Sequence, residues 1–191
     1  MHALPRSTFA LPIFFLGFAF LSLTSFAQNN APVPIRLASA DNIEDLFRPR
    51  RVVTGAVNVK SVEHAAFDLV NRKREESGLQ PLIWSDELET VARLHSGNMA
   101  EFQFFSHRGL DNKMVSDRAD DAKVGTWRSI GENIAFNRGF QDPITKAVDL
   151  WLDSPGHRRN MLNCDWKESA IGVAVAEDGS YYFTQVFLAR R

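Results

Sequence analysis

The hydrophobic pattern of this chain changes its period once, and that change limits the folds that the chain can adopt. Between residues 61 and 155, apolar residues recur every three to four positions, which places them on one face of an α-helix. After residue 170 they form a short continuous run and then alternate, as in β-strands. Helices followed by strands predict an α+β domain in which helices pack on an antiparallel sheet.

Three long stretches have the helical spacing. The first runs from Ser61 to Gly78, the second starts near Ser85, and the third lies between Asp142 and Pro155, with Asp142 as N-cap before a proline. A short helical turn is expected from His157 to Leu162. The predicted buried stripes are Val62, Ala65, Ala66, Leu69 and Val70; Leu88, Val91, Ala92, His95, Met99 and Phe102; and Ile144, Ala147, Val148, Trp151 and Leu152.

Two strands are predicted to close the chain. Ile171 to Ala176 is a short apolar run, and Tyr181 to Leu188 is rich in aromatic residues. Asp178-Gly179 between them is a strong hairpin turn signal. Ser129 to Phe136 is a candidate third strand.

Residues 1–27 have the pattern of a secretion signal peptide. Arg6 precedes an apolar run from Phe9 to Leu23, and Ser25-Phe26-Ala27 offers small residues at the positions that flank a cleavage site. The alternative, a membrane anchor, needs about 20 apolar residues, whereas this run is shorter and contains Pro12 and Gly17. We therefore expect cleavage after Ala27, a secreted or periplasmic protein, and no stable membrane span after cleavage.

Residues 28–59 are predicted to be a linker or a loosely docked N-terminal arm, because prolines and a basic run interrupt any apolar period. Residues 60–191 are then one domain. The formal net charge of −1 argues against a nucleic-acid partner, since such proteins usually carry a basic surplus. The single cysteine, Cys164, excludes an intrachain disulfide framework, and its simplest interpretation is a small buried apolar residue.

Three titratable residues stand near the ends of predicted elements, where functional sites are often built. They are His107, Glu132 and His157. Two imidazoles and a carboxylate suit a divalent metal with an open position, and they equally suit a proton-transfer pair. We expect the three to converge on one solvent-accessible cleft. A carboxylate between the two imidazoles would raise their pKa values above about 6.5 when no metal is bound.

Other candidates are weaker. His95 lies on a buried stripe, which indicates a hydrogen-bonded core histidine. Ser154 and His157 resemble a Ser–His nucleophile pair, but the sequence shows no third acid to orient the histidine. The four tryptophans are expected to pack in the core rather than to line a sugar groove.

Seven landmarks occur in a recognisable order. They are Asn71-Arg72-Lys73-Arg74, Leu82-Ile83-Trp84-Ser85, Phe105-Ser106-His107, Gly131-Glu132-Asn133-Ile134, Trp151 to Arg158 with Asn160-Met161-Leu162, Ile171-Gly172-Val173, and Tyr182 to Phe187. In this order they make the stretch from about Val62 to Leu188 resemble the CAP superfamily: the cysteine-rich secretory proteins, antigen 5 proteins and pathogenesis-related proteins. The resemblance is greatest to the bacterial, cysteine-poor SCP-like branch.

The resemblance implies a three-layer α-β-α sandwich with a central antiparallel sheet. It also implies a cleft with two histidines and two acidic residues, where animal members can hold zinc or another divalent ion. His107 and Glu132 match two of these positions, but Ser154 and Tyr182 stand at the other two, and His157 belongs to the bacterial Ser-Pro-x-His motif. Since Ser and Tyr are poor zinc ligands, we expect at most weak binding of a divalent cation by His107, Glu132 and His157, and no other cofactor.

Members of this family are described as lipid carriers, channel modulators, defence proteins and, disputedly, proteases, so the resemblance does not settle an activity. The first hypothesis is a binding module for an extracellular or cell-envelope ligand: a cell-wall glycan, a peptide or a lipid. The second is a hydrolase acting on envelope polymer or protein, possibly metal-assisted, with Glu132 as general base. The third is a polar cluster that only locks loops together. The predicted cleft residues are His107, Glu132, Asn133, Ser154, His157 and Tyr182.

Overall fold

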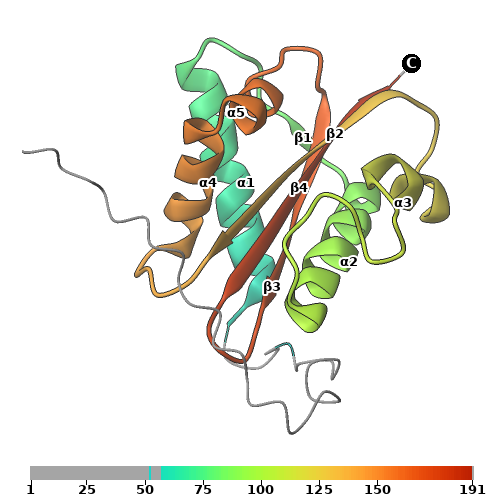
Figure 1. Ribbon diagram of the computed structural model, residues 1–191. Helices are drawn as coiled ribbons and strands as arrows, with labels where there is room; N and C mark the ends of the chain where they lie inside the picture. Colours follow the sequence, from blue (N-terminus) through green and yellow to red (C-terminus); the bar gives the residue numbers. More distant parts are fainter. Residues whose placement is uncertain (1–51, 53–56, 191) are drawn as a thin grey trace, which may run out of the picture. The chain divides into compact units, whose positions relative to one another are not determined.

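A computed structural model describes residue 52 and residues 57–190. Residues 57–190 form a sandwich of helices on both faces of one sheet (Figure 1). The strands of this described part have the order β1-β3-β4-β2. β2, β3 and β4 are antiparallel, whereas the short β1 pairs in parallel with β3. The strands are β1 (Ile83–Trp84), β2 (Trp127–Asn137), β3 (Glu168–Val175) and β4 (Tyr181–Arg190). The predicted α+β sandwich with three antiparallel strands is confirmed.

Helices α1, α4 and α5 cover one face of the sheet, and α2 and α3 cover the other (Figure 1). Their bounds are α1 (Val59–Glu76), α2 (Asp86–Phe102), α3 (Val115–Asp121), α4 (Pro143–Asp153) and α5 (Pro155–Met161). All but α3 coincide with predicted helices. α3 is too short to carry a repeated apolar stripe, so the periodicity does not predict it.

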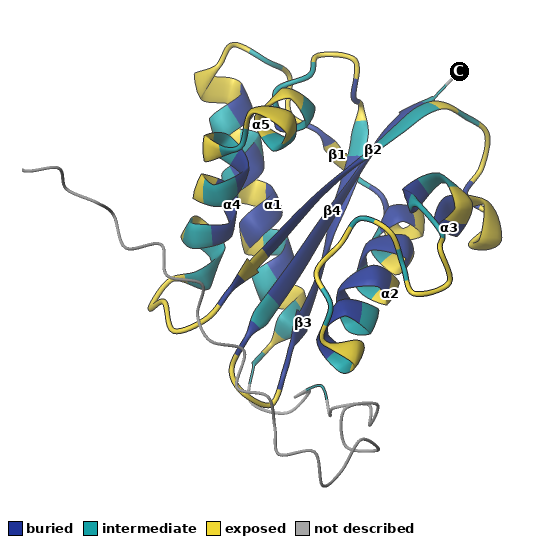
Figure 2. Cartoon of the chain, in the orientation of Figure 1, coloured by how far each residue is buried: buried dark blue, intermediate teal, exposed yellow. Residues whose placement is uncertain are grey.

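The two strands of the predicted hairpin are buried on both faces (Figure 2). On β3, Ile171 and Val173 join the core beneath α1 and α4, which includes Trp151. Ala170, one residue earlier, joins the core beneath α2, with Leu88. Burial on both faces explains why the β3 sequence is a continuous apolar run instead of an alternating one.

Gly172 marks the place where α2 approaches the sheet most closely. A Cβ atom there would lie 2.2 Å from the backbone nitrogen of Arg93. On the same helix, the Oγ of Ser96 lies 2.8 Å from both the Gly172 carbonyl oxygen and the Thr184 Oγ. The glycine of the Ile171-Gly172-Val173 landmark therefore permits the contact that places α2, and with it the loop that follows α2.

Several predicted burials are wrong. Ala65 and Phe102 belong to the predicted stripes but are exposed, because Ala65 lies at the solvent edge of α1 and Phe102 is the last residue of α2. Cys164 is also exposed instead of buried, since it lies in the turn after α5 and not in an element that packs on the sheet. His95 is fully buried, as predicted, and Trp151 and Trp166 are core residues.

The predicted signal peptide, residues 1–27, lies outside the described residues, as does most of the predicted arm, residues 28–59. Asn58 caps α1 by accepting a hydrogen bond from the Ser61 backbone nitrogen at 3.2 Å. Val52 forms an isolated antiparallel bridge with Ala176 at the end of β3. The three domain boundaries stay predictions. Among the described helices, none has the length and apolar character needed to cross a membrane.

Candidate functional site

His107 lies in the loop that follows α2. Gln103 ends that helix in the left-handed conformation, with φ of 53°, which turns the chain back toward β2. The buried ring of His95 then holds the loop, because its Nε2 lies 2.9 Å from the carbonyl oxygen of Ser106. The backbone next to His107 is thus fixed by a core residue on α2.

Glu132 lies on β2, and only 3% of its side chain is exposed. Its Oε1 lies 2.8 Å from Nδ1 of His107, and its Oε2 accepts a hydrogen bond from the guanidinium of Arg118 at 2.5 Å. Arg118, on α3, also donates to the carbonyl oxygens of His107 and Lys113. Both oxygens of this buried carboxylate are therefore engaged, one by His107 and the other by Arg118.

His157 comes to His107 from the opposite side, on α5. The Nε2 atoms of the two rings lie 3.3 Å apart. Asn133 donates from Nδ2 to the carbonyl oxygen of His157 at 2.9 Å, and Asn160 bonds the carbonyl oxygen of Glu132 and the Oδ1 of Asn133. These amides fasten α5 to β2. The structure therefore brings His107, Glu132 and His157 together as a row.

The order within the row differs from the expected one. His107 lies in the middle, between Glu132 and His157, instead of the carboxylate lying between two imidazoles. Burial lowers the pKa of His157, and the neighbouring His107 lowers it further, while the more distant Glu132 opposes these effects. The expected rise in pKa is therefore wrong for His157, whose ring is neutral at pH 7.

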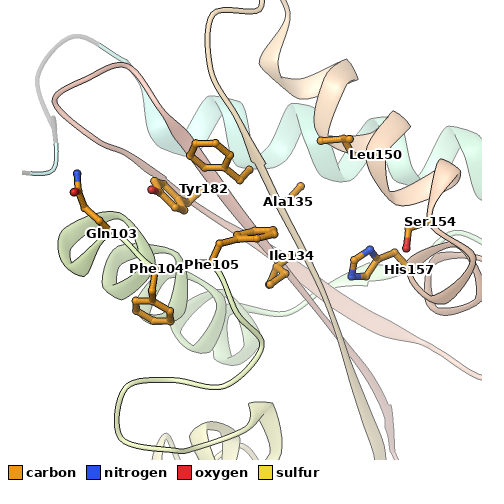
Figure 3. A pocket seen from close by; sticks show the side chains of 10 residues that line it. Gln103, Phe104, Phe105, Ile134, Ala135, Leu150, Ser154, His157 and Tyr182 are labelled. Carbon is orange, nitrogen blue, oxygen red and sulfur yellow. The ribbon is translucent and has the colours of Figure 1, made fainter. Parts of the chain in front are cut away.

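A pocket of about 420 Å³ opens beside this row, over the outer edge of β2 (Figure 3). His157 and Ser154 lie at one end of it, and Gln103 and Tyr182 lie toward the other (Figure 3). Between them the walls are apolar and aromatic. The lining residues are Gln103, Phe104, Phe105, Ile134, Ala135, Phe136, Leu150, Ser154, His157 and Tyr182.

The predicted cleft residues divide into two groups. Ser154, His157 and Tyr182 line the pocket, whereas the side chains of Glu132 and Asn133 are buried behind it. His107 connects the groups, with 39% of its side chain exposed. The sequence does not predict Arg118 as part of the site, because it does not predict α3. It does not predict Phe105 and Phe136 as pocket residues either. Their only signals are the phenylalanine next to Phe105 and the position of Phe136 in the candidate third strand.

The residues present do not fit a metal centre. Both oxygens of Glu132 are engaged by His107 and Arg118, so an ion at this carboxylate would have to share or displace these contacts. Within the part of the chain that the structure describes, no group of three or more His, Cys, Asp or Glu side chains could hold a metal ion. The weak binding of a divalent cation stays a prediction, and no chemical step is assigned to it.

Comparison with known proteins agrees with the fold of this chain. A family model described as the cysteine-rich secretory protein family, CAP, matches residues 67–187. The uncharacterized membrane protein YlbC of Bacillus subtilis (strain 168) is 38% identical over 128 residues, 67% of this chain and 34% of that protein. The uncharacterized protein YkwD of the same bacterium is 31% identical over 133 residues, 70% of this chain and 49% of that protein. The chain therefore matches less than half of the length of either relative.

Two solved structures show the same fold. One is an extracellular protein containing an SCP domain from Bacillus anthracis str. Ames, with a TM-score of 0.59 and 32% identity, covering 69% of this chain and 41% of that one. The other is an outer surface protein from Borrelia burgdorferi, with a TM-score of 0.64 and 20% identity, covering 74% of this chain and 99% of that one. This chain belongs to the cysteine-rich secretory protein (CAP) family.

Proposed function

We propose that this protein is exported and binds an extracellular or cell-envelope ligand by enclosing an apolar group of that ligand in the pocket beside β2. One observation carries the proposal: a pocket of about 420 Å³ with aromatic and aliphatic walls ends at the polar pair Ser154 and His157. Ligand sites usually combine apolar walls with a few polar groups that orient the ligand. The SCP-domain relative from Bacillus anthracis is described as extracellular, which agrees with export.

The apolar walls favour some of the hypothesised ligands over others. The aromatic rings of Phe105 and Phe136 lie 6.2 Å apart, and that of Phe136 lies 5.0 Å from Tyr182. Such a cluster gains most by covering an acyl chain or an apolar peptide side chain. A polar glycan would leave these walls poorly matched, so a lipid or peptide is the favoured ligand.

The alternative hydrolase with Glu132 as general base has less support. The Glu132 side chain is buried, and its two oxygens accept from His107 and Arg118. A general base must reach the proton that it removes, and Glu132 does not line the pocket. The third hypothesis, a purely structural cluster, accounts for Asn133 and Asn160 but leaves the pocket without a role.

Two exposed phenylalanines allow a matched test with the fluorescent probe 1-anilinonaphthalene-8-sulfonate. Phe105 and Phe140 are equally exposed, at 51%, but only Phe105 lines the pocket. Phe105→Ala should weaken probe binding about tenfold, which corresponds to about 1.4 kcal/mol, whereas Phe140→Ala should leave it unchanged. Equal effects of the two substitutions, or no saturable binding to the wild-type protein, would contradict the proposal.

A further inference from the structure

β2 is an edge strand along its whole length. In the sheet order β1-β3-β4-β2 it pairs with β4, and its other edge has no neighbouring strand among the described residues. Proteins usually protect such an edge with a proline, a bulge or a short strand, because its backbone groups can pair with another chain. β2 has 11 residues and no proline, and its register shift lies at the far end, between Trp127 and Ser129. The part of the edge that borders the pocket, at Ile134 and Phe136, therefore lacks these protections.

The register of the sheet determines which backbone groups of β2 point away from β4. At the hairpin, Ala176 donates from its backbone nitrogen to the carbonyl oxygen of Ser180 at 2.9 Å. Every second residue counted from Ser180 therefore faces β3, and the residues between them, such as Phe183, face β2. On β2, the partner of Phe183 faces β4. The residues on either side of that partner, Ile134 and Phe136, consequently point their N–H and C=O groups away from the sheet.

A side chain of α5 supports this direction independently. Asn160 donates from Nδ2 to the carbonyl oxygen of Glu132 at 3.0 Å, so this carbonyl, two residues before Ile134, points to the outer edge. The same alternation places the N–H and C=O groups of Ile134 and Phe136 on that edge. Within the described part of the chain, none of these four groups has a recorded hydrogen bond. Two donors and two acceptors are thus left for a ligand.

The pocket leads to these groups. Ile134 is only 4% exposed and lies at its bottom, whereas Phe136 is 40% exposed. Phe105 flanks β2 on one side, and Leu150 and His157 flank it on the other (Figure 3). A buried backbone group without a partner costs free energy, so a ligand that pairs with Ile134 removes that cost. Because walls rise on both sides, a single extended chain fits this edge better than a second sheet with its own helices.

We propose that an extended peptide binds here by adding a strand to the outer edge of β2, with one apolar side chain in the pocket. This inference rests on the proposed function, because the pocket must hold the apolar group, and it selects a peptide over a lipid. N–H and C=O groups in alternation are complementary to another main chain, whereas an acyl chain would leave all four without a partner. In strand addition, main-chain hydrogen bonds supply affinity and pockets for alternate side chains supply specificity.

The two walls of the pocket define the side chains that the peptide should carry. Successive side chains of an added strand point to opposite faces of the sheet. A side chain on one face meets the rings of Phe105 and Phe136 and should be apolar. The next one meets Ser154 and His157 on the other face and should be able to form a hydrogen bond. We therefore expect an apolar residue beside a serine, threonine or asparagine.

The test selects ligands from a random heptapeptide library displayed on phage, with the exported protein as target. The peptide that binds most tightly is synthesised with two analogues, which carry N-methyl groups on the even-numbered or on the odd-numbered amides. One analogue should bind at least about tenfold more weakly than the parent and the other within about threefold, because only every second N–H group of an added strand faces β2. Equal binding of the two analogues would overturn strand addition.

Hydrogen exchange measured by NMR locates the bound peptide. Binding should slow the exchange of the Ile134 and Phe136 amide protons at least about tenfold. The amide of Gly139, in the exposed turn after β2, is the control and should not change. Unchanged exchange at Ile134 and Phe136 would overturn the proposal. So would slow exchange of both amides before peptide is added to a protein that sediments as a dimer, because a second copy would then occupy the edge.

Two substitutions of one residue separate the backbone from the ring. Phe136→Ala and Phe136→Pro both remove the ring, but only proline removes the N–H group, which the ladder with β4 does not use. Phe136→Pro should therefore bind the selected peptide about threefold more weakly, or worse, than Phe136→Ala does. Equal affinities of two folded variants would overturn the assigned hydrogen bond. If Phe136→Pro does not fold, the N-methyl analogues and the exchange rates still decide.

Binding of 1-anilinonaphthalene-8-sulfonate separates this inference from the proposed function. If the library yields no peptide while probe binding still depends on Phe105, strand addition is refuted and the proposed function stands. If Phe105→Ala binds the selected peptide as tightly as the wild-type protein and Phe140→Ala do, the proposed function of the pocket is refuted. The N-methyl analogues then decide strand addition alone.

Discussion

The Nε2 atoms of His107 and His157 face each other at 3.3 Å. At this distance the two rings share one proton when both are neutral, because two unprotonated or two protonated nitrogens would repel each other. Glu132 fixes the arrangement from the other side of His107, since its carboxylate accepts from Nδ1. Through these contacts, the buried Glu132 carboxylate on β2 influences where the proton lies on the ring of His157, which lines the pocket.

The ion pair between Glu132 and Arg118 is expected to be critical for stability. Both side chains are almost fully buried, with 3% and 4% exposed. Glu132→Gln leaves the arginine charge uncompensated in the interior, so we expect a loss of about 3 kcal/mol in the free energy of unfolding. Denaturant unfolding of the two proteins measures this loss.

Glu87→Gln is the matched control, because Glu87 pairs with Arg190 at the surface. Its effect should be below about 0.5 kcal/mol, as for other exposed ion pairs. If the two substitutions had equal effects, the Glu132–Arg118 pair would have no special role in holding α3 against β2.

A second prediction concerns the contact between α2 and β3. Gly172→Ala places a Cβ atom 2.2 Å from the backbone of α2, and backbone cannot move aside as a flexible side chain can. We expect a loss of about 3 kcal/mol or more in stability, from overpacking of a close-packed interior. Thermal unfolding should show a lower midpoint.

Gly97→Ala is the control on the same helix. Nothing lies within 4 Å of a Cβ atom added at Gly97. Replacing a glycine inside an α-helix should stabilise the protein by about 0.5–1 kcal/mol. Destabilisation by both substitutions would mean that α2 tolerates no change at all, which would contradict the specific role assigned to Gly172.

Periodicity was sufficient to predict the elements that form the sandwich. Each long helix carries two or more turns of apolar residues, and Asp178-Gly179 marks the hairpin between β3 and β4. Periodicity did not predict α3, because its seven residues are too few for an apolar stripe to repeat. Arg118 was missed for this reason, although it completes the environment of Glu132.

The candidate site was predictable only as a set of residue types near element ends. His107 follows the end of α2 and His157 lies in the first turn of α5, as expected, but Glu132 lies in the middle of β2 and not at its end. Their order could not be predicted, because it depends on which side of β2 each side chain approaches. The pocket was not predictable either, since it requires Phe105 and Phe136 to remain partly exposed, which hydrophobicity alone opposes.

A third prediction concerns divalent cations. Because Glu132 is engaged by two hydrogen-bond donors, zinc can meet only the two imidazole nitrogens, and it must first displace the proton between them. Zinc at a moderate excess over an untagged protein should therefore stabilise the fold by less than about 1 kcal/mol. Thermal unfolding with zinc and with a chelator measures the difference, and a larger stabilisation that His157→Gln removes would contradict this prediction.

The last prediction is a dependence of stability on pH that originates in His95. Burial lowers the pKa of His95 below its usual value near 6.5, and Arg118 and His107 act in the same direction, while Glu132 and the Ser106 carbonyl oppose them. The folded state therefore binds a proton on this ring less readily than the unfolded state does. Stability from this source is complete above pH 6.5 and is lost as the pH falls from there through the folded-state pKa.

His95→Gln should remove this dependence while keeping a donor for the Ser106 carbonyl oxygen. We expect the free energy of unfolding of the wild-type protein to fall between pH 7 and pH 5, and that of the variant to fall less over the same window. Denaturant titrations at several pH values measure both slopes. Parallel slopes would show that His95 is not the group responsible and would point to the half-buried ring of His157, whose pKa is also lowered.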